Sequence, residues 1–321
     1  SFTPRRMSGI DPWVSGILVT SFDESKGPVV QYSWPSSVLS PSLQEEVVLY
    51  SLPKVSPKDP TNCFFVFRLR CDKDSPYFDC SFREHNYLYG YVYFQCHEDS
   101  SFSRGFSQSS TVVLSPLPLY EFYRAFTTKL HQMHAFYGFA ILPIALEAVD
   151  DWPFPRAGEK YSLSIMDTTF EAIIPDSPSL RFLLQRRRTL SVSSPKHQTG
   201  NIHGDLLGSP TLTATSFPFV QELPLVMDEQ APKLNSRRVS GLFEDMSLLP
   251  LMKYTHEIID LLWAQLVLSH SILVYGSSVS IVTQCVLSLA SLICPLEPQL
   301  DIRPTLTIYD SDLSAFSHPS S

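Results

Sequence analysis

The side chains that could take part in chemistry are few, and they are scattered along the 321-residue chain. His131 and His134 stand three residues apart, a spacing that would bring two imidazoles to one helix face, where they could hold a metal ion. Because no cysteine or carboxylate nearby completes the ligand shell, ordinary helix histidines are the preferred interpretation, and we predict no metal. Ser277 and Asp310 each follow a strand-like run, where binding groups often gather. A helix-capping turn and a solvated loop are the simpler interpretations of those two positions.

Three motifs that would identify a catalytic site are absent from the sequence: the phosphate loop G-x-x-x-x-G-K-[ST], the nucleophile elbow G-x-S-x-G and the zinc motif H-E-x-x-H. Only 12 glycines stand against 26 prolines, which argues against phosphate-cradling loops and for long connections between elements. We therefore predict no catalytic residue and no cofactor. The formal net charge of −8 disfavours nucleic acid as a partner, since that binding needs a basic surface to displace phosphate counterions.

The cysteines and the apolar runs bear on the compartment. The six cysteines include no C-x-x-C pair and no signal peptide precedes them, so free thiols are expected. No stretch qualifies as a transmembrane segment, because the most apolar region, 258–275, carries Asp260, Gln265 and His270. We expect a cytoplasmic protein.

Residues 175–250 are rich in Ser, Pro and Arg and lack an apolar period, which predicts a disordered linker. Within it, Arg186 to Arg188 precede Ser191, and Arg237 and Arg238 precede Ser240. Arginines two or three residues before a serine suit basophilic kinases, and a phosphate there would lie beside a guanidinium cluster. Ser191 and Ser240 are therefore candidate phosphorylation sites, although Ser- and Arg-rich linkers also produce this pattern by chance.

The elements that would position these groups form an α/β chain in two parts. In the first part, residues 10–174, a polar turn between two short runs predicts a hairpin over 16–32, and Ser40-Pro41 predicts a helix start. Further strands are expected at 63–70, 87–95, 111–114 and 161–174, with helices along 122–133 and 141–149. This order predicts a sheet covered by helices.

The second part, residues 251–321, begins with a helix on which Ile258, Leu262 and Leu266 recur at four-residue spacing. A strand at 271–275, a helix from Val282 and a strand at 305–309 should follow. Strand, helix and strand at this spacing predict a parallel β-α-β unit with a right-handed crossover. Because the pattern stops before a sheet is complete, we expect the chain to be truncated within this part.

Several runs, in their order and spacing, resemble segments of DENN-domain proteins. The most discriminating run is Asp150-Asp151-Trp152-Pro153-Phe154-Pro155, which resembles the sixth subclass of that family. The other resembling runs are VTSFD at 19–23, YSWP at 32–35, YGYVYF at 89–94, RGFSQSS at 104–110, VLSPLP at 113–118, LVY at 273–275, CPL at 294–296, RP at 303–304 and TIYDS at 307–311.

The resemblance implies a longin-like α/β module over residues 10–174 and the start of an α/β central DENN module over 251–321. It also implies a guanine-nucleotide exchange factor, or part of one, for a Rab-family small GTPase, recruited from the cytoplasm to recycling endosomes. Such a factor binds the GTPase switch regions and releases GDP without an acid, base or nucleophile. The resemblance assigns no GTPase-contact residue. The alternatives are a trafficking adaptor of the late secretory pathway and an α/β enzyme using Ser277 or Asp310.

Overall fold

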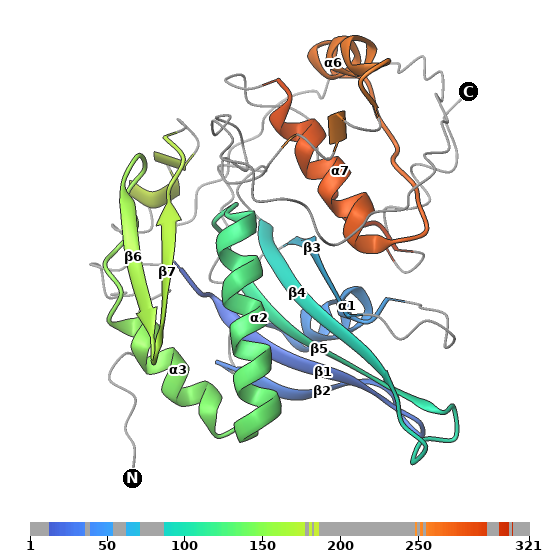
Figure 1. Cartoon of the computed structure of the whole chain (residues 1–321), viewed down its shortest axis with the longest axis vertical. Coiled ribbons are helices and arrows are strands. Elements are labelled where there is room, and N and C mark those ends of the chain that lie inside the picture. Colours follow the sequence, from blue (N-terminus) through green and yellow to red (C-terminus); the bar gives the residue numbers. More distant parts are fainter. Residues whose placement is uncertain are drawn as a thin grey trace, which may run out of the picture.

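The computed structural model describes residues 13–35, 39–53, 62–70, 87–176, 180–181, 183–185, 248, 251–252, 255–293, 302–307 and 310. It confirms the predicted α/β class (Figure 1). In chain order the elements are β1 (Gly16–Asp23), β2 (Gly27–Trp34), α1 (Pro41–Ser51), β3 (Asn62–Arg70), β4 (Tyr87–Glu98), β5 (Phe106–Ser115), α2 (Tyr120–Tyr137), α3 (Ile141–Asp150), β6 (Lys160–Ile165), β7 (Thr168–Ile173), α6 (Ile259–Val267) and α7 (Val279–Ser291).

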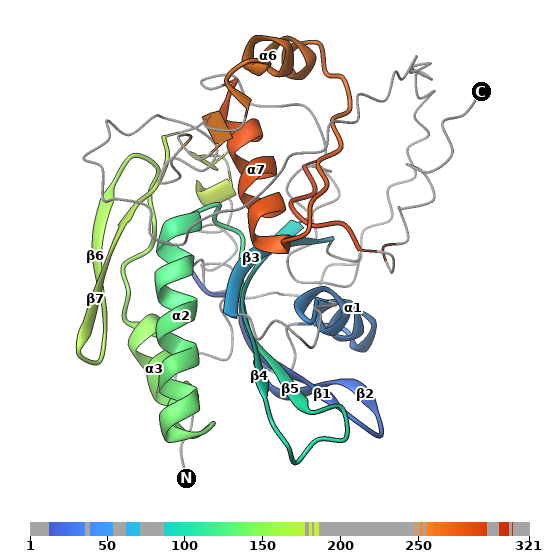
Figure 2. The ribbon, with the colours of Figure 1, turned by 45° about the vertical axis from the view of Figure 1, so that its right-hand side comes forward.

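The first five strands form one antiparallel sheet in the order β2-β1-β5-β4-β3. Helix α1 covers one face, and α2 with α3 cover the other (Figure 2). Along β1, Ile17 and Val19 enter the apolar cluster beneath α2, whereas Leu18 enters the cluster beneath α1. Because both faces are covered, the edge strand β3 reads as a nearly continuous apolar run from Cys63 to Phe67. The element order β-β-α-β-β-β-α is the one that the sequence predicted.

The remaining predicted strand pair of the first part is also present, as the hairpin β6–β7, which packs against α2 and α3 outside the main sheet (Figure 1). Tyr161, Leu163 and Ile165 alternate inward along β6 and join the cluster beneath α2. The hairpin therefore adds a layer over the helical face of the sheet.

Helices α6 and α7 confirm the two helices predicted in the second part, but the strands predicted around α7 are wrong where the structure describes them. Residues 271–275 and 305–307 are not strands, and residues 308 and 309 lie outside the described residues. Ile272 and Val274 pack on the cluster between α6 and α7, while the residues beside them are more exposed. That alternation produced the strand prediction, but a strand also needs a hydrogen-bonded neighbour, and neither sheet of the described residues includes this segment.

The predicted linker, 175–250, contains a short helical stretch near its start. Residues 180–181 and 183–185 form helical backbone, and Leu180 and Leu184 are buried in the cluster beneath α2. Burial of these two side chains explains why the backbone is regular here. The candidate phosphorylation sites Ser191 and Ser240 lie outside the described residues.

Candidate functional site

His131 holds α2 to the sheet. Its Nδ1 lies 3.0 Å from Thr111 Oγ1 and its Nε2 lies 2.8 Å from Gln95 Oε1. The neutral tautomer with a proton on Nε2 fits both contacts, because Nε2–H then donates to Gln95 and Nδ1 accepts from Thr111. Burial, with a smaller contribution from His134, lowers the pKa of His131 to about 4. The ring of His134 instead faces Phe139, with ring centroids 4.6 Å apart.

The two histidines are therefore not arranged as a pair of metal ligands, since both ring nitrogens of His131 already have sheet partners. Across the residues that the structure describes, no group of three His, Cys, Asp or Glu side chains could hold a metal ion. Cys63, Cys96 and Cys285 are free thiols, and burial raises the pKa of Cys96 and Cys285. Within the same described ranges, no helix is long and apolar enough to span a bilayer.

Ser277 and Asp310 have different surroundings. Ser277 is exposed just before α7. Asp310 is only 6% exposed; its Oδ2 accepts a hydrogen bond from Tyr50 Oη at 3.4 Å and lies 3.6 Å from Arg303 Nη1. Burial and the Asp310 carboxylate raise the pKa of Tyr50, so its hydroxyl stays protonated and able to donate. Asp310 is thus an internal residue that pairs with the nearby Arg303 and accepts a hydrogen bond from the distant Tyr50.

Helix α7 lies across the outer edge of the sheet, beside β3 (Figure 2). Leu287, which is fully buried, belongs to the cluster beneath α2, while Val279 packs against the cluster beneath α1. Other side chains of the same helix, including Cys285 and Leu289, form a third cluster with Leu262 of α6. One helix therefore contributes to all three apolar clusters of the described chain.

The segment that follows α7 continues this cover along β3. Arg68 Nη1 donates to the carbonyl oxygen of Ile302 at 2.8 Å, and Thr305 Oγ1 donates to that of Val66 at 2.8 Å. Thr283 Oγ1 lies 3.0 Å from Thr305 Oγ1 and 3.4 Å from the carbonyl oxygen of Pro304, so its one proton is shared between the two, while Thr305 uses its own proton on Val66. The carbonyl of an edge strand is thereby satisfied by a side chain, which also blocks pairing with another strand.

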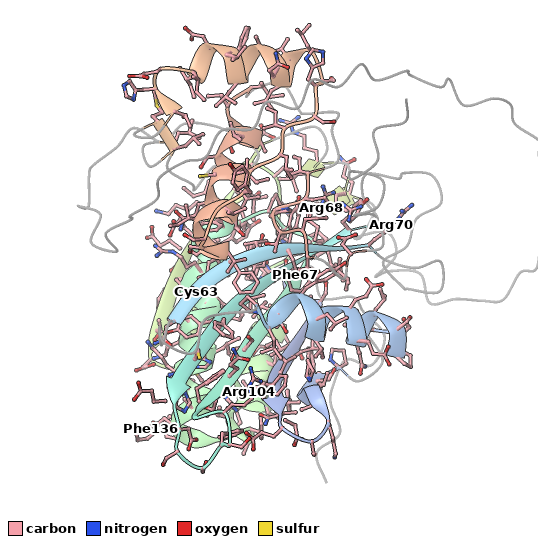
Figure 3. The ribbon with its side chains drawn as sticks, turned by 90° about the vertical axis from the view of Figure 1, so that its right-hand side faces the viewer. Cys63, Phe67, Arg68, Arg70, Arg104 and Phe136 are labelled. Atoms are coloured by element: carbon pink, nitrogen blue, oxygen red, sulfur yellow. The ribbon has the colours of Figure 1, made fainter. Side chains whose placement is uncertain are left out.

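Two arginines meet over one tyrosine at the same place. The Arg68 guanidinium lies 4.0 Å from the centre of the Tyr87 ring, and the Arg303 guanidinium lies 5.8 Å from it. Such cation–π contacts strengthen where water is excluded, as it partly is here. Figure 3 shows Arg68 on β3 near the C-terminal helices. We call the following residues the edge clasp: Arg68, Tyr87, Thr283, Arg303, Thr305 and Asp310.

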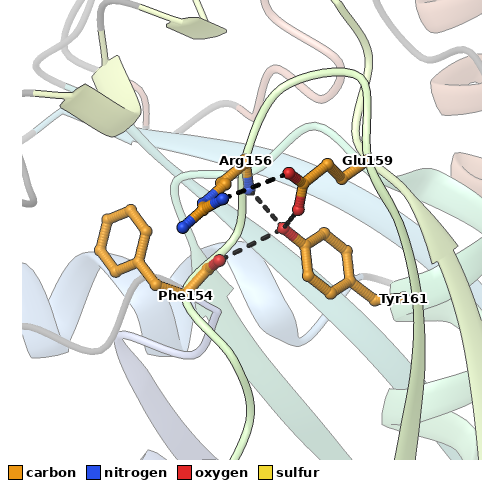
Figure 4. Close-up of polar contacts among 4 residues, drawn as sticks. All are labelled: Phe154, Arg156, Glu159 and Tyr161. Carbon is orange, nitrogen blue, oxygen red and sulfur yellow. Dashed lines mark hydrogen bonds and ion pairs between the residues drawn. The ribbon is translucent and has the colours of Figure 1, made fainter.

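The discriminating run at 150–155 forms a structural corner. Trp13 Nε1 donates to the carbonyl of Pro153 at 2.8 Å. The Tyr161 hydroxyl accepts from the backbone N–H of Arg156 at 2.8 Å and lies 2.7 Å from Glu159 Oε2 and 3.2 Å from the carbonyl of Phe154 (Figure 4). Burial, together with the hydrogen bond to Glu159, raises the pKa of Tyr161 to about 12. These contacts fix the chain direction between α3 and β6.

Two other runs that resemble the family meet at the tips of the β1–β2 and β4–β5 hairpins. Glu24 accepts from Ser103 Oγ at 2.6 Å and from the backbone N–H of Arg104 at 3.1 Å. The Arg104 guanidinium lies over the rings of Phe22 and Phe106, 4.2 and 4.7 Å from their centres. The runs at 19–23 and 104–110 are therefore neighbours in space, and both belong to the pair of hairpin tips.

Sequence reasoning missed an exposed aromatic corner at the turn between α2 and α3. Phe136 is 80% exposed and Tyr137 61% exposed, and Ile144 stands out on α3. Phe139 stacks on Tyr32 of β2, with ring centroids 5.8 Å apart. Figure 3 places Phe136 at the end of the sheet body far from the C-terminal helices. Apolar spacing could not reveal this exposure, because Phe136 and Tyr137 stand three and four residues after Met133 and so continue the apolar stripe of α2.

No protein-family model matches the chain. Three relatives nevertheless match almost all of it. The Protein DENND6 homolog of Dictyostelium discoideum is 25% identical over 327 residues, which cover 96% of this chain and 42% of the relative. Protein DENND6A of Mus musculus is 25% identical over 97% of this chain and 47% of its own length. Protein DENND6B of Homo sapiens is 27% identical over 95% and 48%.

The fold defines the class first: a mixed α/β protein with an antiparallel sheet body and helices docked on the edge of its sheet. The relatives then confirm the resemblance drawn from the sequence, because the chain is similar to DENND6-type proteins along almost its whole length. The chain spans less than half the length of these relatives.

Proposed function

We propose that the chain is a guanine-nucleotide exchange factor, or part of one, for a Rab-family small GTPase in endosomal membrane traffic. The observation that carries this proposal is similarity to DENND6-type proteins over 94% to 97% of the chain. The runs that carry the family resemblance occur in both the first part, 10–174, and the second part, 251–321, so the similarity is not confined to one element.

The chemistry of exchange suits the described residues. An exchange factor accelerates GDP release by binding the nucleotide-free GTPase more tightly than the GDP-bound form, so it needs a shaped surface and no reactive group. The prominent polar groups are all engaged in holding the fold: His131 joins α2 to the sheet, Tyr161 closes a corner and Asp310 pairs with Arg303. The enzyme hypothesis built on Asp310 loses support because that carboxylate is buried in an ion pair.

The experiment compares nucleotide states. The purified 321-residue chain is immobilised and exposed to a panel of Rab GTPases in GDP-bound, nucleotide-free and GTP-analogue-bound forms, and release of fluorescent GDP is followed with the same proteins. We expect at least one Rab to bind best when nucleotide-free and to release GDP faster. A preference for the GTP-analogue form would instead support the adaptor hypothesis, and no binding to any Rab in any state would refute both.

Recruitment from the cytoplasm to endosomes, and phosphorylation of Ser191 and Ser240 by a basophilic kinase, form a second part of the proposal. Both serines follow arginines at the spacing that such kinases read. Mass spectrometry of the protein from its own cells tests the kinase, and finding both serines always unmodified would remove it. Imaging of the tagged chain together with endosomal markers tests recruitment; a uniformly diffuse signal would count against it.

A further inference from the structure

We propose that the edge clasp is a positioning device: it fixes α6 and α7 in one orientation on the sheet body, so that both parts can contact one protein partner together. The partner in this inference is the GTPase of the proposed function, on which that half of the inference rests. The other half, that the clasp sets the orientation, concerns this chain alone and can be judged without any partner.

Apolar packing brings α7 to the sheet edge but leaves its orientation poorly defined. Leu287 and Val279 bury apolar surface in two clusters, and the hydrophobic effect that drives this burial is not directional. Helix α6 contacts α7 through a separate third cluster that contains no residue of the sheet. A rocking motion of the helices about the edge of β3 would cost little if these contacts acted alone.

The clasp supplies the directional contacts. The Thr283 hydroxyl of α7 lies 3.0 Å from the Thr305 hydroxyl, which donates to the Val66 carbonyl of β3 at 2.8 Å. These two contacts connect α7, the segment that follows it and β3. Thr283 is fully buried, so water cannot readily replace its partner. Arg68 adds a second hydrogen bond from β3 to Ile302. Hydrogen bonds weaken steeply when they bend, and two of them along one strand therefore define both distance and direction.

The charged part of the clasp reaches two further elements of the sheet body. Arg303 lies against Tyr87 of β4, and Asp310 accepts from Tyr50 of α1. Arg303 and Asp310 also pair with each other, with side chains 13% and 4% exposed. Moving the segment away from the sheet body would break the hydrogen bond from Tyr50 to Asp310 and the contact of Arg303 with the Tyr87 ring, and a buried carboxylate that loses a hydrogen-bond donor is destabilised. The clasp thus attaches the C-terminal segment to β3, β4 and α1 together.

The surface that the clasp positions carries large exposed apolar side chains. Trp263 of α6 is 49% exposed, and Leu268 and Leu273 beyond it are 63% and 65% exposed. Protein interfaces are enriched in such large side chains, aromatic ones above all. The placement of these three side chains relative to the sheet body depends on the angle at which α6 and α7 sit, and the clasp sets that angle.

The test is the double substitution Arg68→Met and Thr305→Val, which removes both hydrogen bonds to β3 while keeping side-chain bulk. The matched control is Arg124→Met with Thr169→Val, which removes an exposed ion pair and an exposed hydroxyl contact elsewhere on the body. Hydrogen–deuterium exchange of the full chain is the first measurement. We expect amides of α6, α7 and 302–307 to exchange about 10-fold faster in the clasp variant, with β1, β5 and α2 unchanged.

Rab binding is the second measurement. The clasp variant should bind the GTPase that the natural chain binds at least about 10-fold more weakly, and the control variant should bind it unchanged. Restoring a donor with Thr305→Ser in place of Thr305→Val should recover part of the exchange protection. Equal exchange in clasp and control variants would overturn the clasp, and faster exchange with unchanged Rab binding would overturn its positioning role. If the natural chain binds no Rab, the proposed function fails, while the exchange data still decide the clasp.

Discussion

A methyl group at Gly90 would collide with a ring in the core beneath α1. Gly90 of β4 pairs with Phe67 of β3, and the phenyl ring of Phe67 folds over the glycine. A Cβ at this position would lie 2.2 Å from Cζ of Phe67 and 2.5 Å from each of its Cε atoms. Since carbon atoms rest about 3.5–4.0 Å apart, the ring must move by more than about 1 Å to admit the methyl group.

The ring has little room to move. Phe67 is 1% exposed, and Tyr50 packs against it with ring centroids 5.4 Å apart. Inserting a methyl group into a packed core typically costs about 1–3 kcal/mol, and the better strand propensity of alanine returns about 0.5–1 kcal/mol. We therefore expect Gly90→Ala to lower the free energy of unfolding by roughly 1–2 kcal/mol, which corresponds to a melting midpoint lower by about 3–6 °C.

A double-mutant cycle shows whether the collision is the cause. Urea denaturation followed by tryptophan fluorescence would compare the natural chain with Gly90→Ala, Phe67→Leu and the combination of both. Leucine lacks the Cζ and Cε atoms that the methyl group meets, so Gly90→Ala should be neutral or slightly stabilising in the Phe67→Leu background. A coupling free energy of about 1 kcal/mol or more is expected. An equal loss in both backgrounds would refute the reasoning.

Three further substitutions test other parts of the fold. In the folded chain the pKa of His131 is lowered from 6.5 to about 4, so on acidification the unfolded chain binds a proton at this imidazole before the folded chain does. The free energy of unfolding therefore falls as the pH drops from about 6.5 to about 4, by up to about 1.4 kcal/mol per pH unit. His131→Gln should flatten the difference between urea denaturation at pH 7 and pH 5; an unchanged difference would count against it. Trp13→Phe loses the hydrogen bond to Pro153 and opens a gap in the core, so thermal denaturation should show a loss of about 1–3 kcal/mol, and a neutral result would contradict the assigned contact. Phe136→Ser should leave stability within about 0.5 kcal/mol, because the ring is 80% exposed; a clear loss would mean that the ring is covered in solution.

Local sequence signals predicted the sheet body well, because its elements are specified by neighbouring residues. Ser40 and Pro41 mark the start of α1, and the Ser40 hydroxyl does accept from the backbone N–H of Leu43, at 3.4 Å. The turn between β1 and β2 is held by Asp23, which accepts from the backbone N–H groups of Ser25 and Lys26. Signals of this kind need no knowledge of the rest of the chain.

The edge clasp could not be predicted in the same way, because its partners are far apart in sequence. Arg68 and Ile302 are separated by 234 positions, and Tyr50 and Asp310 by 260. No periodicity links such residues, and a hydrogen bond from a side chain to a backbone carbonyl leaves no trace in the identity of the residue that accepts it. The failed strand prediction at 271–275 has the related cause that alternation reports burial and not pairing.

The sequence of helix α7 indicates that the helix is covered on more than one side. Cys285 and Leu289 pack in the cluster shared with α6, whereas Leu287 is fully buried in the cluster beneath α2. A helix that is apolar around most of its circumference must be covered on more than one side. The sequence of α7 is apolar around most of its circumference, so it favours a helix that packs against both the sheet and α6. Because Leu287 and Val279 of this helix pack in the clusters on the two faces of the sheet, α7 joins the C-terminal part to the sheet edge.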